Sequence, residues 1–270
     1  MGTSTSNSGP ESNVSFDPPW LNDLPKEMQS PLDKLEGKQI NIPNIDTLKS
    51  VTAPTMRFAK SRRELNAFLK TSDKQHLRNA LGHYSKTGMG GAKNITHRLS
   101  ISASVGNGLY NFFDGIKNTS NPRIADWVKD IKNSGLQGNE LIDKIINFIV
   151  SDGGSLDEES CKNSIFQSLS ELMENPNIDI LNLSEENIWQ LLTSFISTEV
   201  FNMFCSDAGQ IFERNSISST EKAEKMQEIR DFICADVTVR INEFCQNQSS
   251  VKDILLKAVE TVFSVYEEEL

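Results

Sequence analysis

Residues 56–113 read MRFAKSRRELNAFLKTSDKQHLRNALGHYSKTGMGGAKNITHRLSISASVGNGLYNFF, and the rest of the chain is interpreted outward from this stretch. Between residues 56 and 98 it carries ten Lys and Arg but only two acids, Glu64 and Asp73, a local charge of +8 in a chain of net charge −10. From residue 151 to the end, eight Lys and Arg stand against 23 Asp and Glu, a local charge of −15. The chain therefore divides by charge into a basic and an acidic part.

Helical periodicity begins inside this stretch. Leu65, Phe68 and Leu69 recur at the spacing of one helix face. Ser61 and Glu64 have the spacing of a capping box, which predicts that the first helix starts at Ser61.

The next two helices follow within the same stretch. The second is predicted to run from an Asp73 cap to a C-cap at Gly88, and Gly88 to Gly91 are expected to form a turn. The third, over about 94–113, is rich in Ser, Ala and Gly at three- and four-residue intervals, which would let another backbone approach closely.

The remaining chain repeats the helical period, and no alternating strand pattern competes with it. Its predicted helices begin at Ile124, at Leu141, at Ser155 or Asp157, at Ser184, at Ser219 and at Val251. The predicted class is all-α, with a disordered Pro- and Ser-rich leader (1–55), a basic helical region (56–120) and an acidic helical bundle (121–270).

The leader contains seven of the nine prolines and almost no large apolar residue before Phe16. Such a segment cannot bury enough apolar surface to offset its ordering entropy, so it is expected to be extended or disordered alone. Pro18, Pro19 and Trp20 form a small apolar island with the extended form of a peptide that docks on a partner. Packing of Trp20 on its own body is the equal alternative.

Several protein classes are excluded by the sequence. No run of 18 apolar residues predicts a membrane span, and no signal peptide follows Met1, so a cytoplasmic location is expected. The four cysteines form no CxxC and are expected to be reduced. The three histidines match no metal-ligand spacing, and no nucleophile, paired-carboxylate or Walker motif is present. The sequence therefore predicts no enzyme, metal or cofactor.

The basic stretch could track a phosphate backbone or face an acidic protein surface, and the acidic half of the same chain favours protein docking. The predicted docking residues for a protein or a nucleic acid are Arg57, Arg62, Arg63, Arg78, His83, Tyr84, Lys86, Gly88, Gly90 and Gly91.

Gly2 is the candidate for modification. Met1 is normally removed before so small a residue, and the exposed α-amine has a pKa of about 7.7–8.0, so part of it is an unprotonated nucleophile at neutral pH. The opening also fits a short myristoylation pattern, but no second membrane signal accompanies it. On the residues alone, an inert tail is the stronger interpretation.

Three parts of the sequence resemble the QatB family, the B component of the four-gene Qat anti-phage defence system. They are MGTSTSNSGP (1–10), PPW (18–20) and LRNALGHYSKTG with the following GG (77–91). The resemblance is specific over 1–21 and about 57–113, and beyond 120 it is limited to a similar all-helical region.

The resemblance implies three partners: an ATPase (QatA), a QueC-like deazaguanine enzyme (QatC) and a TatD-like nuclease (QatD). QueC-type enzymes activate a carboxy-deazaguanine and pass the acyl group to an amine, which predicts that Gly2 is the acceptor. The leader recognition residues are then Thr3, Ser4, Thr5 and Ser6 in the run up to Pro10, with Pro18, Pro19 and Trp20. The alternative is a nucleic-acid-binding adaptor that recruits the nuclease through the basic helices.

Overall fold

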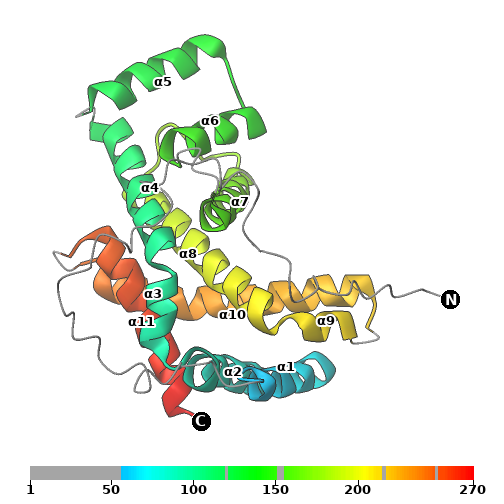
Figure 1. Cartoon of the computed structure of the whole chain (residues 1–270). Coiled ribbons are helices and arrows are strands. Elements are labelled where there is room, and N and C mark those ends of the chain that lie inside the picture. Colours follow the sequence, from blue (N-terminus) through cyan, green and yellow to red (C-terminus); the bar gives the residue numbers. More distant parts are fainter. Residues whose placement is uncertain (1–55, 119–120, 151–154, 215–216, 247–248) are drawn as a thin grey trace, which may run out of the picture. The chain divides into compact units, whose positions relative to one another are not determined.

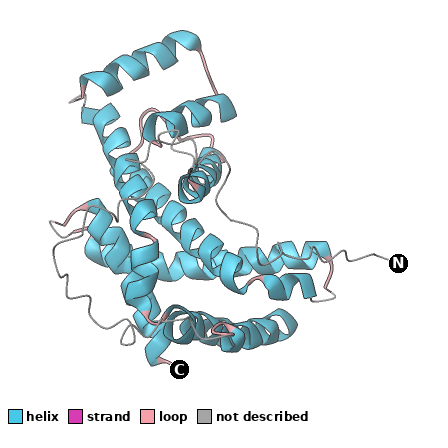
Figure 2. Ribbon diagram, viewed as in Figure 1, coloured by secondary structure: helices cyan, strands magenta, loops and turns pink. Residues whose placement is uncertain are grey.

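The helical periodicity of the sequence corresponds to helices throughout the computed structural model, which describes residues 56–118, 121–150, 155–214, 217–246 and 249–270 (Figure 1). No strand occurs among these residues (Figure 2), so the all-α prediction is confirmed. All of them belong to one compact unit. The leader, with Gly2, Pro18, Pro19 and Trp20, lies outside the described residues.

The basic stretch forms the first helices of the described chain. These are α1 (Ala59–Thr71), α2 (Lys74–His83), the π-helix η3 (Tyr84–Met89), α3 (Ala92–Arg98) and α4 (Ser100–Asn118). The later helices are α5 (Pro122–Ser134), α6 (Asn139–Ile149), α7 (Leu156–Met173), α8 (Glu185–Ala208), α9 (Gln210–Arg214), α10 (Ser219–Phe244) and α11 (Val251–Glu268).

Side-chain caps set most of the helix starts. The Asp73 carboxylate accepts a hydrogen bond from the backbone N–H of Gln75, as predicted. Ser155 begins α7 with a reciprocal capping box, and Ser184 caps α8, again as predicted. The cap of α10 is Ser218, one residue before the expected start. Local side-chain-to-backbone bonds are legible in sequence because both partners lie within three residues.

Three boundary predictions in the basic stretch are wrong. Helix α1 starts at Ala59 and has no side-chain cap, because the Ser61 hydroxyl instead donates to the carbonyl of Ala80 in α2, at 2.8 Å. The second helix does not end at Gly88 but continues through η3 to a left-handed C-cap at Gly90. The third segment is two helices, which are separated at Leu99.

Helix α8 lies at the centre of the packing, since it contacts α4, α7, α9 and α10. Leu192, Phe195, Ile196, Val200 and Phe204 of α8 are completely buried. Helix α11 packs against α2, α3, α4 and α10, and so joins the basic helices to the acidic ones.

Two glycines let helices approach closely. A Cβ at Gly82 of α2 would overlap the backbone carbonyl of Tyr266 in α11. A Cβ at Gly106 of α4 would overlap the side chain of Leu255 in α11. The small residues predicted to permit close approach therefore do so on one face of α4.

Candidate functional site

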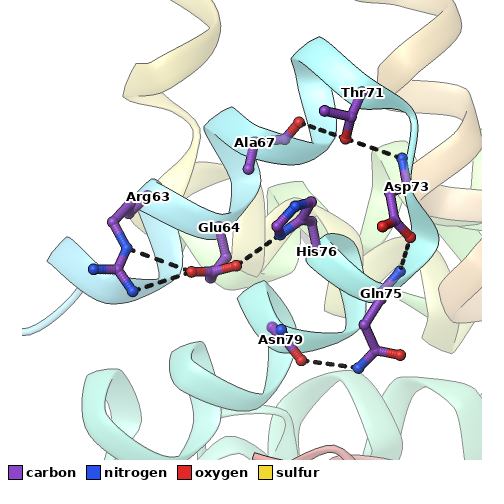
Figure 3. Close-up of polar contacts among 8 residues, drawn as sticks. All are labelled: Arg63, Glu64, Ala67, Thr71, Asp73, Gln75, His76 and Asn79. Carbon is purple, nitrogen blue, oxygen red and sulfur yellow. Dashed lines mark hydrogen bonds and ion pairs between the residues drawn. The ribbon is translucent and has the colours of Figure 1, made fainter.

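The helices α1 and α2 are joined by polar contacts around Glu64 (Figure 3). Its carboxylate contacts the guanidinium of Arg63 at 3.2 Å and the ring Nδ1 of His76 at 2.9 Å. The hydrogen bond from His76 and the positive charge of Arg63 lower the pKa of Glu64 below its ordinary value. The one acid of α1 is thus used to hold two basic side chains within the same hairpin.

Asp207, near the end of α8, receives three groups from the basic stretch. The Tyr84 hydroxyl donates to its carboxylate at 2.8 Å, and Arg98 lies 2.5 Å from the same oxygen. Arg62 donates to its backbone carbonyl at 2.7 Å. Burial raises the pKa of Tyr84 far above its ordinary value, so the hydroxyl remains a neutral donor. Asp207 is therefore an anchor for η3, α3 and α1.

Arg78 forms the main contact between α2 and the acidic C-terminal helices. Its guanidinium lies 3.0 Å from the Glu269 carboxylate and 3.7 Å from that of Asp236. It also stands over the rings of Phe232 and Tyr266, at 5.6 and 5.8 Å from their centroids. A guanidinium held by two carboxylates and two aromatic faces combines ion pairing with cation–π attraction.

The turn after α2 is held by the end of α11. Ser85 donates to the carboxylate of Glu267, and Lys86 donates to the backbone carbonyl of the same residue at 3.2 Å. A Cβ at Gly88 would overlap the Phe58 ring, which packs there against Tyr84. Gly88 is therefore a packing position rather than the predicted turn.

The predicted docking residues differ in exposure. Arg63 is 76% exposed, and Lys86 is also exposed. Arg57, Arg62, Arg78 and His83 are half-buried, whereas Tyr84 and Gly88 are buried and present no surface to a partner. Gly90 and Gly91 have φ values of 80° and 115°, so they supply the left-handed backbone between η3 and α3.

Four lysines of the basic stretch stay free. Lys60, Lys70, Lys74 and Lys93 are exposed and make no ion pair with any residue that the structure describes. The arginines of the stretch are therefore largely engaged within the fold, and the lysines remain available.

A buried polar cluster was not predicted from the sequence. Glu199 of α8 is 5% exposed and accepts hydrogen bonds from Ser102 at 2.6 Å, Ser160 at 3.0 Å and Ser164 at 2.5 Å. The thiol of Cys161 lies 3.6 Å from the same carboxylate, and burial with this negative charge raises the thiol pKa to about 12. A glutamate inside an apolar helix run is the only signal in sequence that could have indicated this cluster.

No group of three or more His, Cys, Asp or Glu side chains is arranged to hold a metal ion in the described part of the chain. Of the histidines, His76 pairs with Glu64, and His83 has a ring Nδ1 that is buried without a partner. The four cysteines are free. Within the described helices, none has the length and apolarity needed to cross a membrane.

Residues 90–268 match the family model described as "Qat anti-phage system associated protein QatB". The match covers more than half of the chain. The chain belongs to the QatB family. No curated protein and no solved structure matches it significantly.

Membership of the QatB family makes this chain a component of an anti-phage defence system, and other Qat components are its expected partners. The matched region runs from just before α3 to the end of α11. It overlaps the stretch with the predicted resemblance only from residue 90 to 113. The family signal therefore extends over the acidic helices, where the sequence had indicated only a similar helical region.

Proposed function

We propose that this chain is a non-enzymatic docking component of the Qat system, and that its leader is an acceptor for amide conjugation at Gly2 by a QueC-like enzyme. Family membership supports the place in the defence system. The observation that supports docking is the division of labour in the basic helices, where arginines anchor the helices internally and Lys60, Lys70, Lys74 and Lys93 remain exposed.

The conjugation rests on the chemistry of the α-amine. A free Gly2 amine attacks the carbonyl carbon of an activated deazaguanine carboxylate, which forms an amide bond. The activating group leaves with the carbonyl's former carboxyl oxygen, and the amine gives up a proton. The pKa of an α-amine, about 7.7–8.0, leaves enough of it unprotonated for this reaction at neutral pH.

Mass spectrometry of the intact protein and of its N-terminal peptide tests the conjugation directly. The protein is expressed with and without its QueC-like neighbour, and an adduct on Gly2 is expected only with the neighbour. Gly2→Pro should abolish the adduct because it hinders the amine, while Gly9→Pro serves as the matched control and should retain it. A free Gly2 in the presence of the complete system would contradict the proposal.

The alternative role is a nucleic-acid-binding adaptor for the TatD-like nuclease, with the same four lysines on the phosphate backbone. Arg62 and Arg78 are poor positions for this test, because both hold the fold. Lys60→Glu, Lys70→Glu and Lys74→Glu should instead be combined. An adaptor loses DNA affinity, and its salt slope falls by roughly one per lost phosphate contact. A docking protein loses a Qat partner in a pull-down and binds no DNA in the first place.

A further inference from the structure

A groove lies between α8 and α10 near the end of α7, away from the basic helices. Its volume is about 960 Å³. It is lined by Glu171, Glu174, Glu186, Trp189, Gln190, Thr193, Ser194, Gln227, Arg230, Asp231, Cys234, Thr238, Asn242 and Cys245. The α10 side alone runs from Gln227 to Cys245, roughly 27 Å at the rise of an α-helix. A groove of this length suits a chain segment better than a compact ligand.

The groove carries negative charge that no described cation compensates. Arg230 is the one basic residue among the lining residues, and its guanidinium is committed to Glu171 at 2.5 and 2.6 Å. The Arg230 bonds outweigh the effect of burial and lower the pKa of Glu171, so this pair stays charged. Glu174, Glu186 and Asp231 line the groove without an ion pair to any described residue.

Trp189 lies beside Glu186, one helical turn along α8, and its ring is half-buried against Tyr110. The groove thus combines an aromatic face with a neighbouring carboxylate. The same two elements hold Arg78 elsewhere in this fold, where the guanidinium lies over Phe232 and pairs with Glu269. In the groove, the corresponding cation is missing among the described residues.

We propose that the groove between α8 and α10 is the docking site for an arginine-bearing segment of another protein, with an arginine seated over Trp189 and paired with Glu186. Glu174 and Asp231 attract further basic side chains of the same segment. Arginine fits better than lysine because its planar, weakly hydrated guanidinium both stacks on an indole and pairs with a carboxylate. A second copy fits less well, since the free cations of the basic stretch are lysines.

This inference specifies the partner chemistry for the docking part of the proposed function, and it is independent of Gly2. The probe is a fluorescein-labelled amphipathic peptide with arginines on one helical face and leucines on the other, titrated with the full-length protein and followed by anisotropy. A groove variant combines Glu174→Gln, Glu186→Gln and Asp231→Asn. A matched control removes the same charge from α5 and α6 by Asp126→Asn, Asp130→Asn and Glu140→Gln, all at exposed positions.

The groove variant should bind the probe roughly tenfold more weakly, while the control stays within about twofold of the wild type. A lysine-for-arginine peptide should also bind more weakly than the probe. Equal weakening in both variants would overturn the proposal, because binding would then follow net charge alone. So would no binding to the wild type, equal binding of the lysine peptide, or self-association in sedimentation that the groove variant abolishes, which would make a second copy the occupant.

Discussion

The Arg78 junction between α2 and α11 and the Glu199 cluster between α4, α7 and α8 hold carboxylates in opposite ways. At the junction, Arg78 and Glu269 have side chains that are 32% and 37% exposed, and positive charge meets negative charge. In the cluster, Glu199 is 5% exposed and contacts hydroxyl groups instead of a cation. Charges are paired where water still screens them, whereas the buried carboxylate is solvated by protein dipoles. The two regions should therefore respond differently to substitution, salt and pH.

Loss of the Glu199 carboxylate should have the largest effect. Glu199→Ala leaves three serine hydroxyls without their acceptor and opens a cavity, so the free energy of unfolding should fall by about 3–5 kcal/mol. Urea unfolding followed by circular dichroism measures this loss. Ser104→Ala is the control, because that exposed hydroxyl donates only to Ser100 of its own helix. A Glu199→Gln protein as stable as the wild type would show that the negative charge of the cluster contributes nothing.

Packing at the junction should come next. Gly82→Ala places a methyl group against the backbone carbonyl of Tyr266, which no side-chain rotation relieves, and should destabilise the protein by about 2 kcal/mol. Gly108→Ala is the matched control in α4, where the new Cβ meets only Ile149 at 3.5 Å. It should be neutral or stabilise by up to about 1 kcal/mol. Thermal unfolding of the two variants decides whether the close approach is rigid.

Arg78 itself should matter less than Gly82. Arg78→Ala removes a partly exposed ion pair and two cation–π contacts, so a loss of about 1 kcal/mol is expected. Sodium chloride should reduce this difference, since salt screens exposed charges, but it should leave the Glu199→Ala difference unchanged. Arg63→Ala, at an exposed pair, should cost less than Arg78→Ala. A salt-independent Arg78 effect would mean that packing, not charge, holds the junction.

The smallest expected effect is on pH dependence, through His83 at the end of α2. Burial, with the nearby charge of Lys60, lowers the pKa of His83 below 6.5 in the folded protein. Between that lowered value and 6.5 the unfolded chain binds the proton more readily, so stability should fall as the pH drops below about 6.5 and level off below the folded pKa. His83→Gln should remove this slope in unfolding measured between pH 7 and 5. An unchanged slope would assign it to other groups.

The sequence could predict the helices and most caps because those signals are local. Asp73, Ser155 and Ser184 each cap the helix that follows them within three residues. Ser61 has the same local pattern but bonds to Ala80, nineteen residues away, and so misplaces the first helix start. Long-range partners of this kind, including Asp207 with Tyr84, are set by packing and have no spacing that a sequence pattern could reveal.

Part of the candidate site was predictable and part was not. The basic stretch and its acidic counterpart are visible as charge, and the structure brings Arg62, Arg78 and Arg98 onto α8, α10 and α11. The separation of anchoring arginines from free lysines depends on which helix face is covered. The Glu186–Trp189 groove depends on how α8 and α10 diverge, which helical periodicity does not specify.

The π-helix η3 fixes the length of the segment between α2 and α3 as well as its composition. It directs Tyr84 toward Asp207 and Ser85 toward Glu267 before the chain turns at Gly90. One residue fewer would turn every following side chain by roughly 100° about the helix axis. Ala92, Ile95 and Leu99 would then leave the core. Substitutions can accumulate in residues 84–89, but natural insertions and deletions should be rare there.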